Sequence, residues 1–429
     1  MSREMKDSGV EWLGQIPQEW FKVKVKDLVK IVGGNGFPIK LQGKRNGDYP
    51  FYKNSDLNVN GPYINSANNY LDNQIVEQKK YSIIPKNSII MSKIGESMKK
   101  NHRKINIEAC LIDNNIQALV SKNIIDTNYK YLYYLMTIID SNWFDNRGTV
   151  PSINNNAFKN QIVFIPDEST QSIIANFLDR KTTEIDTIVG KTKQSIEELK
   201  AYKQSLITET VTKGLNPDAP MKNSGIDWID KIPEHWHINM INNYFYELKS
   251  KNKNMIENNL LSLSYGNIIR RNIETTNGLL PASFENYNIL EKGDIVLRMT
   301  DLQNDKKSLR TGYVTERGII TSAYITLRTK HVNTINSRYT QLYLHSFDIH
   351  KGFYGMGGGV RQSVNYNDLK KTPILVPPIE EQTKIVKFLI EKNQQIDNLI
   401  TKKQKMIKEL ESYKQSLIYE YVTGKKEVE

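Results

Sequence analysis

Four candidate sites in this sequence have residue types that are found in catalytic or ligand-binding sites. FYGMG at 353–357 matches the F-x-G-x-G loop with which amino-methyltransferases hold S-adenosylmethionine. That loop ends a strand of a doubly wound sheet and works together with an Asp/Asn-Pro-Pro-aromatic motif. The sole Pro-Pro pair, at 377–378, is followed by Ile379. The glycine-rich segment 355–359 is therefore interpreted as a flexible loop.

A phosphate loop and a nuclease site have equally little support. GKT at 190–192 resembles the end of a phosphate loop, but the first glycine of G-x-x-x-x-G-K-[ST] would fall on Ile185. Asp167 with Glu198 and Lys200 imitates a nuclease set, whose carboxylates must meet on a sheet around Mg²⁺. Because Glu198 and Lys200 fall within a helical pattern, we interpret them as solvated helix residues.

Histidine and cysteine offer no metal site either. The six histidines show no metal-ligand spacing that recurs in both halves of the chain. The single cysteine, Cys110, excludes an internal disulfide framework and cysteine-based zinc fingers, and it is expected to be a partly buried thiol. We therefore predict no catalytic residue, no metal and no cofactor in this chain, and a binding role for it.

The size and charge of the chain bound the remaining possibilities. Its 429 residues exceed what one core usually holds, so two or three domains are expected. Lys and Arg number 59 against 47 Asp and Glu, and the resulting net charge of +12 favours a polyanionic partner. The opening MSREMKDSG has no apolar core, and no run approaches the roughly 18 apolar residues of a membrane span. A cytoplasmic protein without membrane contact is expected.

The second half of the chain repeats the first. Three segments recur: SGVEWLGQIPQEW (8–20) as SGIDWIDKIPEHW (224–236), IPDESTQSIIANFL (165–178) as VPPIEEQTKIVKFL (376–389), and AYKQSLITETVT (201–212) as SYKQSLIYEYVT (412–423). The first recurs at an offset of 216 residues and the other two at 211. This period is too long for a solenoid. It indicates duplication of a unit made of an opening motif, a variable globular region and a long helix.

Each copy of the unit ends in a predicted long helix. No proline lies between 169 and 213, and Ser169 or Thr170 can cap the start. The residues expected at the contact between the two helices, which we call the seam, are spaced alternately four and three positions apart. This spacing keeps one face of each helix toward its partner. The predicted helix-pair interface comprises Ile185, Val189, Ile196, Leu199, Leu206, Ile396, Ile400, Ile407, Leu410 and Leu417. Lys203 and Lys414 also occupy seam positions, which suggests loose pairing there or the arrival of a third helix.

The predicted fold class is α+β, with a pseudo-two-fold internal repeat. Two mixed α/β domains are separated by two long helices that pack as an antiparallel coiled coil. The expected boundaries are 1–165 for the N-terminal arm and first domain, 166–215 for the first helix, 216–376 for the second arm and domain, and 377–429 for the second helix. Because the frame repeats while the globular regions differ, we interpret the chain as one scaffold with two different binding domains.

The doubled Trp…Pro opening, the VPPIEEQ helix entry and the YKQSLI helix together carry a resemblance over nearly the full length of the chain. The chain resembles the specificity subunit of type I restriction–modification enzymes, whose pattern is two target-recognition domains, each followed by a long helix. One departure is the first helix entry, IPDESTQ, because the family's Pro-Pro…Glu-Gln is complete only at Pro377, Pro378, Glu381 and Gln382. This departure leaves the start of the first helix open.

The resemblance implies partners and a division of labour. Two modification (methyltransferase) subunits would dock on the helix pair, and restriction (motor-nuclease) subunits would lie outside them. The complex would methylate adenine N6 with S-adenosylmethionine, or translocate and cut unmodified double-stranded DNA with ATP and Mg²⁺, cofactors that the partner subunits hold. This chain would read an asymmetric two-part DNA target, one half-site per domain, with the helix pair setting the distance between the half-sites.

Arg, Lys, Asn and Gln are the side chains that read base edges, and basic residues gather in turn-rich segments of both halves. The candidate DNA-binding residues are Lys93, Lys99, Lys100, Arg103, Lys104, Arg147, Arg270, Arg271, Arg298, Lys306, Lys307, Arg310, Tyr354 and Arg361. As a set they predict a phosphate-tracking face, although any one of them is more often a solvated surface residue. Arg298 and Arg361 are the preferred base readers.

Aromatic residues of the arms and helices supply candidates for partner docking. Tyr202, Tyr413, Tyr419 and Tyr421 lie on the predicted helices. The arm tryptophans at 12, 20, 228 and 236 fit core packing as well as a partner interface. A fused restriction–methylation enzyme is disfavoured because both catalytic motifs are missing. A coiled-coil scaffold whose heads bind no DNA stays open as the alternative.

Overall fold

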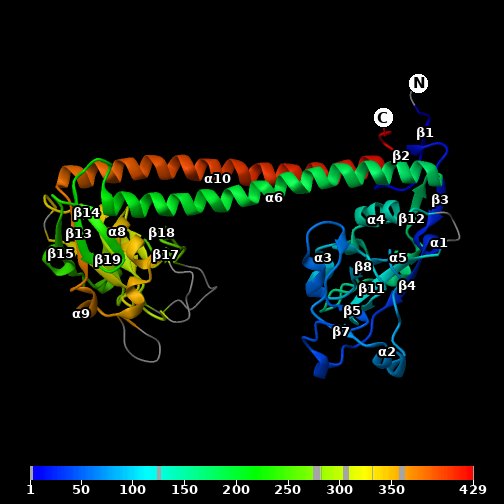
Figure 1. Ribbon diagram of the computed structural model, residues 1–429, viewed down its shortest axis with the longest axis horizontal. Helices are drawn as coiled ribbons and strands as arrows, with labels where there is room; N and C mark the ends of the chain where they lie inside the picture. Colours follow the sequence, from blue (N-terminus) through cyan, green and yellow to red (C-terminus); the bar gives the residue numbers. More distant parts are fainter. Residues whose placement is uncertain are drawn as a thin grey trace. The chain divides into compact units, whose positions relative to one another are not determined.

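The computed structural model describes residues 3–122, 127–273, 281, 283–302, 309–330, 332–356 and 363–428. The chain forms two compact units. The first unit contains Met1–Lys193 and Gln404–Glu429, and the second contains Gln194–Lys403. Each unit holds an arm, a globular head and parts of two long helices (Figure 1). We call residues 3–20 the first arm, 21–165 the first head, 221–236 the second arm and 237–376 the second head.

The first arm is an antiparallel hairpin, and the first head is closed by its own two ends. Strands β1 (Met5–Asp7) and β2 (Gln15–Pro17) form the hairpin. Strand β3 (Phe21–Lys24) at the start of the head pairs antiparallel with β12 (Ile162–Ile165) at its end. Trp20, at the junction of arm and head, is 2% exposed, so arm and head share a core.

The body of the first head is a five-stranded sheet in the order β4-β11-β8-β9-β6, with a smaller sheet β10-β5-β7. The pairs β6–β9 and β10–β5 are parallel, and the other pairs are antiparallel. Every residue of β8 and β9 is buried, as expected for central strands. The strands are β4 (Val29–Gly33), β5 (Tyr49–Tyr52), β6 (Tyr63–Ile64), β7 (Tyr70–Leu71), β8 (Ile89–Ser92), β9 (Arg103–Asn106), β10 (Leu111–Ile112) and β11 (Ile116–Ser121). The helices are α1 (Val25–Leu28), α2 (Asn73–Lys79), α3 (Glu96–Lys99), α4 (Tyr129–Ile138) and α5 (Asn155–Asn160).

The second unit repeats this frame around different contents. Strands β13 (Met221–Ile226) and β14 (Ile229–Pro233) form the second arm, and β15 (His237–Met240) pairs with β24 (Pro373–Val376) to close the second head. Inside lie a sheet ordered β16-β23-β20-β21 and two two-stranded sheets. Their strands are β16 (Phe245–Glu247), β17 (Leu261–Ser264), β18 (Asn267–Arg270), β19 (Asn288–Leu290), β20 (Ile295–Leu297), β21 (Thr311–Tyr313), β22 (Gly318–Ile320) and β23 (Ile325–Thr329). The helices are α7 (Ile241–Tyr244), α8 (Ser337–Ile349) and α9 (Tyr366–Leu369).

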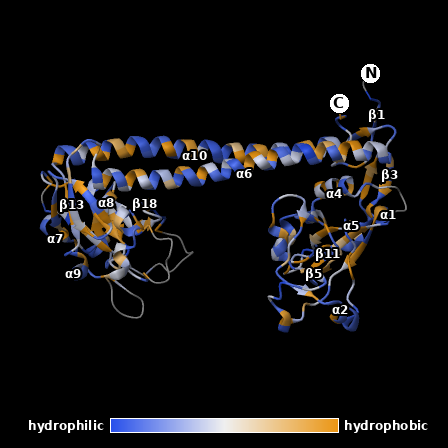
Figure 2. Cartoon of the chain, in the orientation of Figure 1, coloured by the Kyte–Doolittle hydropathy of each residue, from blue (hydrophilic) through white to orange (hydrophobic). Residues whose placement is uncertain are grey.

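The long helices are α6 (Glu168–Lys213) and α10 (Ile379–Val422). Apolar residues recur along both of them among polar ones (Figure 2). The cross-helix contacts have residue numbers that sum to nearly the same value, which is the mark of antiparallel pairing. Phe177 meets Tyr421 and Asp186 meets Lys414 in the first unit, while Lys203 meets Asp397 in the second. The predicted fold class is confirmed.

Ion pairs hold the two lysines that were expected to loosen the seam. The Nζ atom of Lys414 lies 2.6 Å from a carboxylate oxygen of Asp186, and that of Lys203 lies 2.7 Å from one of Asp397. The offset of 211 residues that relates the two lysines also relates the two aspartates. The seam therefore carries the same ion pair once in each unit.

The first helix begins one residue earlier than Ser169, and its cap is Asp167 rather than Ser169 or Thr170. The Asp167 carboxylate accepts hydrogen bonds from the Thr170 amide at 3.1 Å and from the hydroxyls of Ser169 and Thr170, both at 2.7 Å. These hydrogen bonds favour the ionised form and lower the pKa of Asp167 to about 2. Asp167 therefore has a structural task that satisfies the first turn of α6.

Candidate nucleic-acid interface

Each head is fastened to the start of the long helix that follows it by a glutamine. The amide oxygen of Gln171 accepts from the backbone N–H of Asn128 at 3.0 Å, and its amide nitrogen donates to the Pro166 carbonyl at 3.0 Å. Gln382, at the equivalent repeat position, bonds in the same way to Asn336 at 2.7 Å and to the Pro377 carbonyl at 2.8 Å. The sequence IPDESTQ therefore keeps the anchoring glutamine although it lacks the second proline.

A tyrosine fastens each head to the end of the other long helix. The hydroxyl of Tyr131 in α4 donates to the Val422 carbonyl at 3.2 Å, and that of Tyr339 in α8 donates to the Val211 carbonyl at 2.9 Å. Both tyrosines are fully buried. Each head thus sits on a fixed base made of one helix start and one helix end.

In the first head, two segments far apart in sequence meet at the end of the central strand β8. The amide of Ile153 donates to the Lys93 carbonyl at 3.0 Å, and the amide of Gly95 donates to the Pro151 carbonyl at 2.8 Å. These bonds bring the loop 145–153 beside the segment 93–100. The predicted residues Lys93, Lys99, Lys100 and Arg147 all lie on these two segments.

The second head has the same construction at the end of β20. The amide of Val364 donates to the Met299 carbonyl at 3.0 Å, so the segment before α9 joins the segment after β20. Arg298 is the first residue after β20, and its side chain is exposed. The predicted base reader Arg361 belongs to the segment before α9 but lies outside the described residues, as do Lys306 and Lys307.

Three of the predicted DNA contacts are wrong because the side chains are buried in the heads. Arg103 is 4% exposed and donates to the Ile139 carbonyl and the Ser141 hydroxyl. Lys104 is 7% exposed and donates to the carbonyls of Val59 and Gly61. Arg310 is 1% exposed and donates to the carbonyls of residues 298, 300 and 301. These cations satisfy backbone carbonyls, and burial lowers the pKa of Arg103 to about 10 and that of Lys104 to about 8.

The exposed candidates divide into paired and outward-facing cations. Arg270 forms an ion pair with Glu316, and Lys99 forms one with Glu96 at 2.8 Å. The side chains of Lys100, Arg147, Arg271 and Arg298 are exposed, and that of Lys93 is half-buried. Tyr354 is half-buried, with the Arg310 guanidinium 5.6 Å and the Lys351 ammonium 4.6 Å from its ring centre. Tyr354 is therefore part of a cation–π cluster at the edge of the head.

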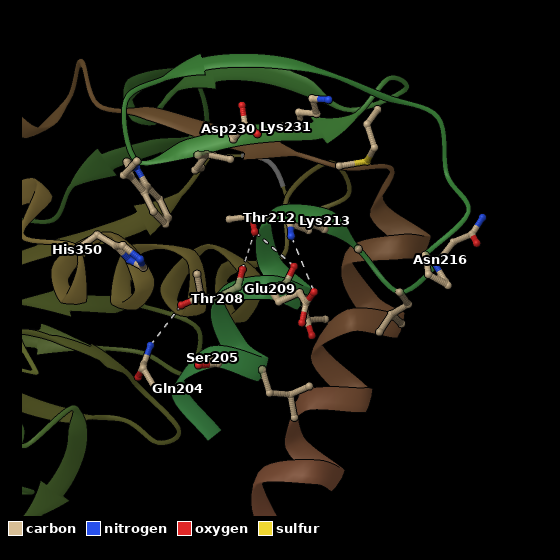
Figure 3. A pocket seen from close by; sticks show the side chains of 18 of the residues that line it. Gln204, Ser205, Thr208, Glu209, Thr212, Lys213, Asn216, Asp230, Lys231 and His350 are labelled. Carbon is tan, nitrogen blue, oxygen red and sulfur yellow. Dashed lines mark hydrogen bonds and ion pairs between the residues drawn. The ribbon is translucent and has the colours of Figure 1, made fainter. Parts of the chain in front are cut away.

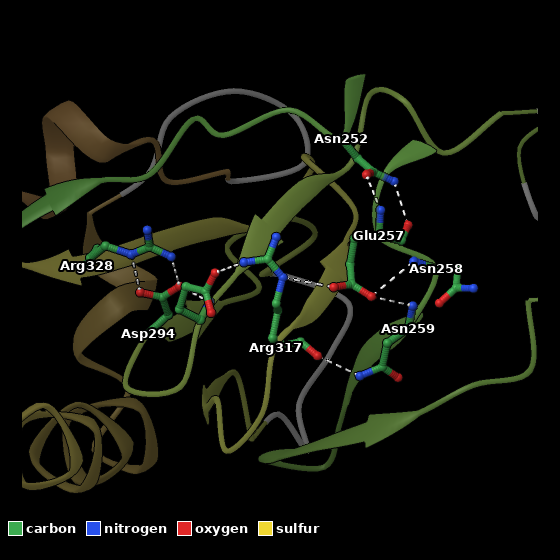
Figure 4. A network of polar contacts seen from close by, with 8 residues as sticks. Asn252, Glu257, Asn258, Asn259, Asp294, Arg317 and Arg328 are labelled. Atoms are coloured by element: carbon green, nitrogen blue, oxygen red, sulfur yellow. Dashed lines mark hydrogen bonds and ion pairs between the residues drawn. The ribbon is translucent and has the colours of Figure 1, made fainter. Parts of the chain in front are cut away.

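A polar network in the second head uses further arginines that the sequence did not single out (Figure 4). Arg317 donates to Glu257 at 2.9 Å and is paired with Glu291. Arg328 forms two bonds to Asp294, at 2.8 and 2.7 Å. Because carboxylates neutralise both guanidiniums, the network joins strands and leaves little charge for a polyanion.

All ten residues of the predicted helix-pair interface are shielded from solvent. Six are 5–9% exposed, namely Ile185, Val189, Ile196, Ile396, Ile407 and Leu417, and the other four are half-buried. Of the predicted docking tyrosines, Tyr202 and Tyr413 are 57% and 56% exposed. Tyr419 and Tyr421 are half-buried and contact other residues of the first unit.

The arm tryptophans pack within their own units. Trp236 is fully buried, and its indole N–H donates to Glu381 at 3.1 Å. Trp12 contacts Trp143, with ring centres 5.2 Å apart and the rings tilted by 47°. Trp228 contacts three rings of α8 and of the residue that follows it, at 4.9–5.9 Å. Packing within the head is therefore a sufficient role for these residues.

The segments that imitate a phosphate loop and a nuclease site belong to α6 or to its cap. GKT at 190–192 and both Glu198 and Lys200 lie inside α6, and Asp167 caps that helix. Within the described ranges there is no group of three His, Cys, Asp or Glu side chains that could hold a metal ion. No helix in the described part of the chain is long and apolar enough to cross a membrane. Cys110 is fully buried, and burial raises the pKa of its thiol to about 12.

Comparison with known proteins assigns this architecture to a family. Residues 17–198 and 241–412 match the Type I restriction modification DNA specificity domain. A solved chain from a study of complex assembly and conformational transition in the type I R-M system shares the fold, with a TM-score of 0.68 and 14% identity, covering 95% of this chain and 98% of that one. The HsdS subunit from Thermoanaerobacter tengcongensis has a TM-score of 0.51 and 14% identity at the same coverage.

Two similar sequences come from Methanocaldococcus jannaschii. The putative type I restriction enzyme MjaX specificity subunit is 25% identical over 398 residues, which are 88% of this chain and 87% of that relative. The type I restriction enzyme MjaVIII specificity subunit is 23% identical over 303 residues, which are 66% of this chain and 64% of that relative. The chain thus spans just under two thirds of the MjaVIII subunit's length.

Two different heads on one duplicated frame, with a match to a DNA specificity domain in each half, define a class of DNA-recognition proteins. Because the domain match covers well over half of its residues, the chain belongs to the family of type I restriction–modification specificity subunits. Its role is DNA specificity in restriction–modification.

Proposed function

We propose that this chain reads an asymmetric, two-part target in double-stranded DNA, one half-site per head. The observation that carries the proposal is a frame that repeats in both units, while the segments at the ends of β8 and β20, which we call the reading segments, differ. The Gln171 and Gln382 anchors and the Tyr131 and Tyr339 bonds repeat in both units. By contrast, the sheets and the basic residues at the ends of β8 and β20 differ. Two unlike heads imply two unlike half-sites, and hence a non-palindromic target.

The antiparallel helix pair sets the distance between the two half-sites. At 1.5 Å per residue, a helix of about 45 residues is roughly 67 Å long. Apolar seam residues and one ion pair in each unit support a stiff pair rather than two separate helices. A stiff spacer converts helix length into a fixed number of base pairs, at about 3.4 Å each.

Two modification subunits dock on the helix pair. On each long helix the tyrosine that directly precedes the seam lysine is exposed, and so is an aliphatic side chain fourteen residues before that tyrosine. These residues are Ile188 and Tyr202 on α6, and Leu399 and Tyr413 on α10. In the antiparallel register Ile188 lies at the level of Tyr413, and Leu399 at that of Tyr202. Each unit therefore presents one aliphatic and one aromatic side chain, which suits two copies of one partner.

Chemistry belongs to the partners. Modification subunits with S-adenosylmethionine methylate adenine N6, and restriction subunits with ATP and Mg²⁺ translocate and cut unmodified DNA. This chain contributes recognition and is not itself an enzyme.

Mapping of methylated adenines tests the proposal. DNA of random sequence is incubated with the chain, modification subunits and S-adenosylmethionine, and methylated positions are sequenced. We expect two different short half-sites at one fixed separation. Palindromic sites, or methylation without sequence preference, would contradict it. If the chain binds partners but shows no salt-dependent affinity for duplex DNA, the scaffold alternative holds instead.

Substitution of Arg298 tests whether the segment that follows β20 reads bases in the second head. Arg298→Ala should weaken binding to the target by about 1–3 kcal/mol while binding to random DNA changes little, since a base contact discriminates sequences. Arg270→Ala is the matched control, because Glu316 already holds that guanidinium. Equal losses on target and random DNA would reduce Arg298 to a phosphate contact. Fluorescence anisotropy at two salt concentrations measures both affinities.

A further inference from the structure

The two copies of the repeat differ where a long helix ends against an arm. AYKQSLITETVT at 201–212 and SYKQSLIYEYVT at 412–423 agree in most positions. Thr208 and Thr210 of α6, however, stand where α10 has Tyr419 and Tyr421. Two large aromatic side chains in the first unit therefore correspond to two small ones in the second.

In the first unit one of these tyrosines contacts the arm and the other contacts α6. The hydroxyl of Tyr419 donates to the Trp12 carbonyl at 2.7 Å, and the ring of Tyr421 lies 4.4 Å from that of Phe177. Lys425, just past the helix end, donates to the Leu13 carbonyl at 2.6 Å and to the Gln15 carbonyl at 3.0 Å. The end of α10 thus supplies two phenol rings and an ammonium group to this surface.

In the second unit the corresponding surface borders a cavity of about 1050 Å³ (Figure 3). The cavity lies between the end of α6, the arm strand β14, the end of α8 and helix α10. The Thr208 hydroxyl donates to that of Ser346 at 3.2 Å instead of reaching the arm.

The walls of the cavity match the surface that the tyrosines cover in the first unit. Trp228, Ile229 and Phe388 line it, and they occupy the repeat positions of Trp12, Leu13 and Phe177. The Trp228 carbonyl therefore corresponds to the Trp12 carbonyl, which accepts the hydrogen bond from the Tyr419 hydroxyl in the first unit. The charges also differ: exposed Asp230 lines the cavity at the position of Gly14, Lys231 and Lys213 line it at the positions of Gln15 and Gly424, and Gly214 replaces the cation Lys425.

We propose that this cavity receives a tyrosine side chain from a segment of the modification subunit. The apolar wall takes the ring, and the Trp228 carbonyl accepts a hydrogen bond from the phenol hydroxyl. The partner would supply to the second unit the phenol group that the chain's own C-terminal end supplies to the first. The inference rests on the proposed function for the identity of the partner, but not for the chemistry of the cavity.

The chemistry is tested by titrating the full-length chain with p-cresol, the isolated tyrosine side chain, in a calorimeter. We expect one site in the wild-type chain, none in Thr208→Tyr and one in the matched control Thr208→Ser. Tyr419→Thr should open the equivalent space in the first unit and give two sites. Binding that Thr208→Tyr leaves unchanged, or no binding to the wild type, overturns the proposal. If Thr208→Tyr does not fold, as judged by circular dichroism, the gain in Tyr419→Thr decides.

The partner is tested by titrating the same variants with the modification subunit. Thr208→Tyr should weaken one of two binding steps at least tenfold, and Thr208→Ser should weaken neither. Unchanged assembly by Thr208→Tyr, even where p-cresol binding is lost, overturns the assignment to this partner. If the wild-type chain binds no modification subunit at all, the proposed function fails, and the cresol titration still decides the cavity.

Discussion

At the residue scale, several charged side chains of this protein form hydrogen bonds with backbone groups. The Asp167 carboxylate satisfies an orphan N–H at the start of α6 and two neighbouring hydroxyls. The buried side chains of Arg103, Lys104 and Arg310 donate to backbone carbonyls inside the heads. Each of these groups resembles a functional residue because it is charged and lies in or beside an irregular segment. Each instead meets a backbone requirement created by that segment.

Replacement of Asp167 tests this role. Asp167→Ala should lower the free energy of unfolding by about 1 kcal/mol, while Asp167→Asn should lower it less, since asparagine also caps helices. The pKa of Asp167 is lowered to about 2, so its contribution is complete above the unfolded value near 4 and is lost as the pH falls toward 2. Urea denaturation at pH 7 and pH 2 measures both effects. If the difference in the free energy of unfolding between wild type and Asp167→Ala is as large at pH 2 as at pH 7, the ionised carboxylate is not its source.

Burial of the three cations could not be predicted from the sequence. Lys104 and Lys100 lie in one basic segment, KKNHRK, yet one is 7% exposed and the other is exposed. The difference arises because Lys104 belongs to the central strand β9, which local sequence does not reveal. Arg298 and Arg147, at the ends of buried strands or in loops, are exposed as the turn-rich sequence predicted.

At the element scale, the long helices were predictable and the strands were not. The four-three spacing extends over 22 residues in each helix, from 185 to 206 and from 396 to 417, so its many positions reinforce one period. Strands of two to six residues carry too few positions for that, and their partners are set by contacts distant in sequence. β6 and β9, for example, pair in parallel although some 40 residues separate them. The helix start also escaped prediction because Asp167, Ser169 and Thr170 all suit a cap.

The repeated ion pair across the helices yields a prediction at this scale. Asp186→Lys should place a second ammonium group beside that of Lys414. The repulsion should lower the free energy of unfolding of the first unit by about 1 kcal/mol. The double reversal Asp186→Lys with Lys414→Asp should restore most of the loss. The equivalent Asp397→Lys is the matched variant, because it disrupts the same pair with Lys203 in the second unit. Thermal denaturation of the four chains tests it, and a double reversal no better than Asp186→Lys would show that the pair is not coupled.

At the scale of the whole molecule, the proposed function makes the distance between half-sites a property of α6 and α10 alone. The reading segments lie in the heads, and each head is anchored by hydrogen bonds to helix ends within its own unit. Helix residues near the middle of the pair, such as Lys193 and Lys403, belong to no head. A change in helix length there should therefore alter the spacer and leave both half-sites unchanged.

A seven-residue insertion after Lys193 in α6, combined with one after Lys403 in α10, tests this prediction. Duplicating the preceding seven residues in each helix keeps the four-three spacing of the seam, so the pair should still form. The added length is about 10.5 Å, which corresponds to roughly three base pairs. Methylation mapping should then show the same two half-sites with a spacer longer by about three base pairs. The same insertion in α6 alone is the control: it puts the two seams out of register, and no spacer should be selected. An unchanged spacer with both insertions would mean that the helix pair does not measure the DNA.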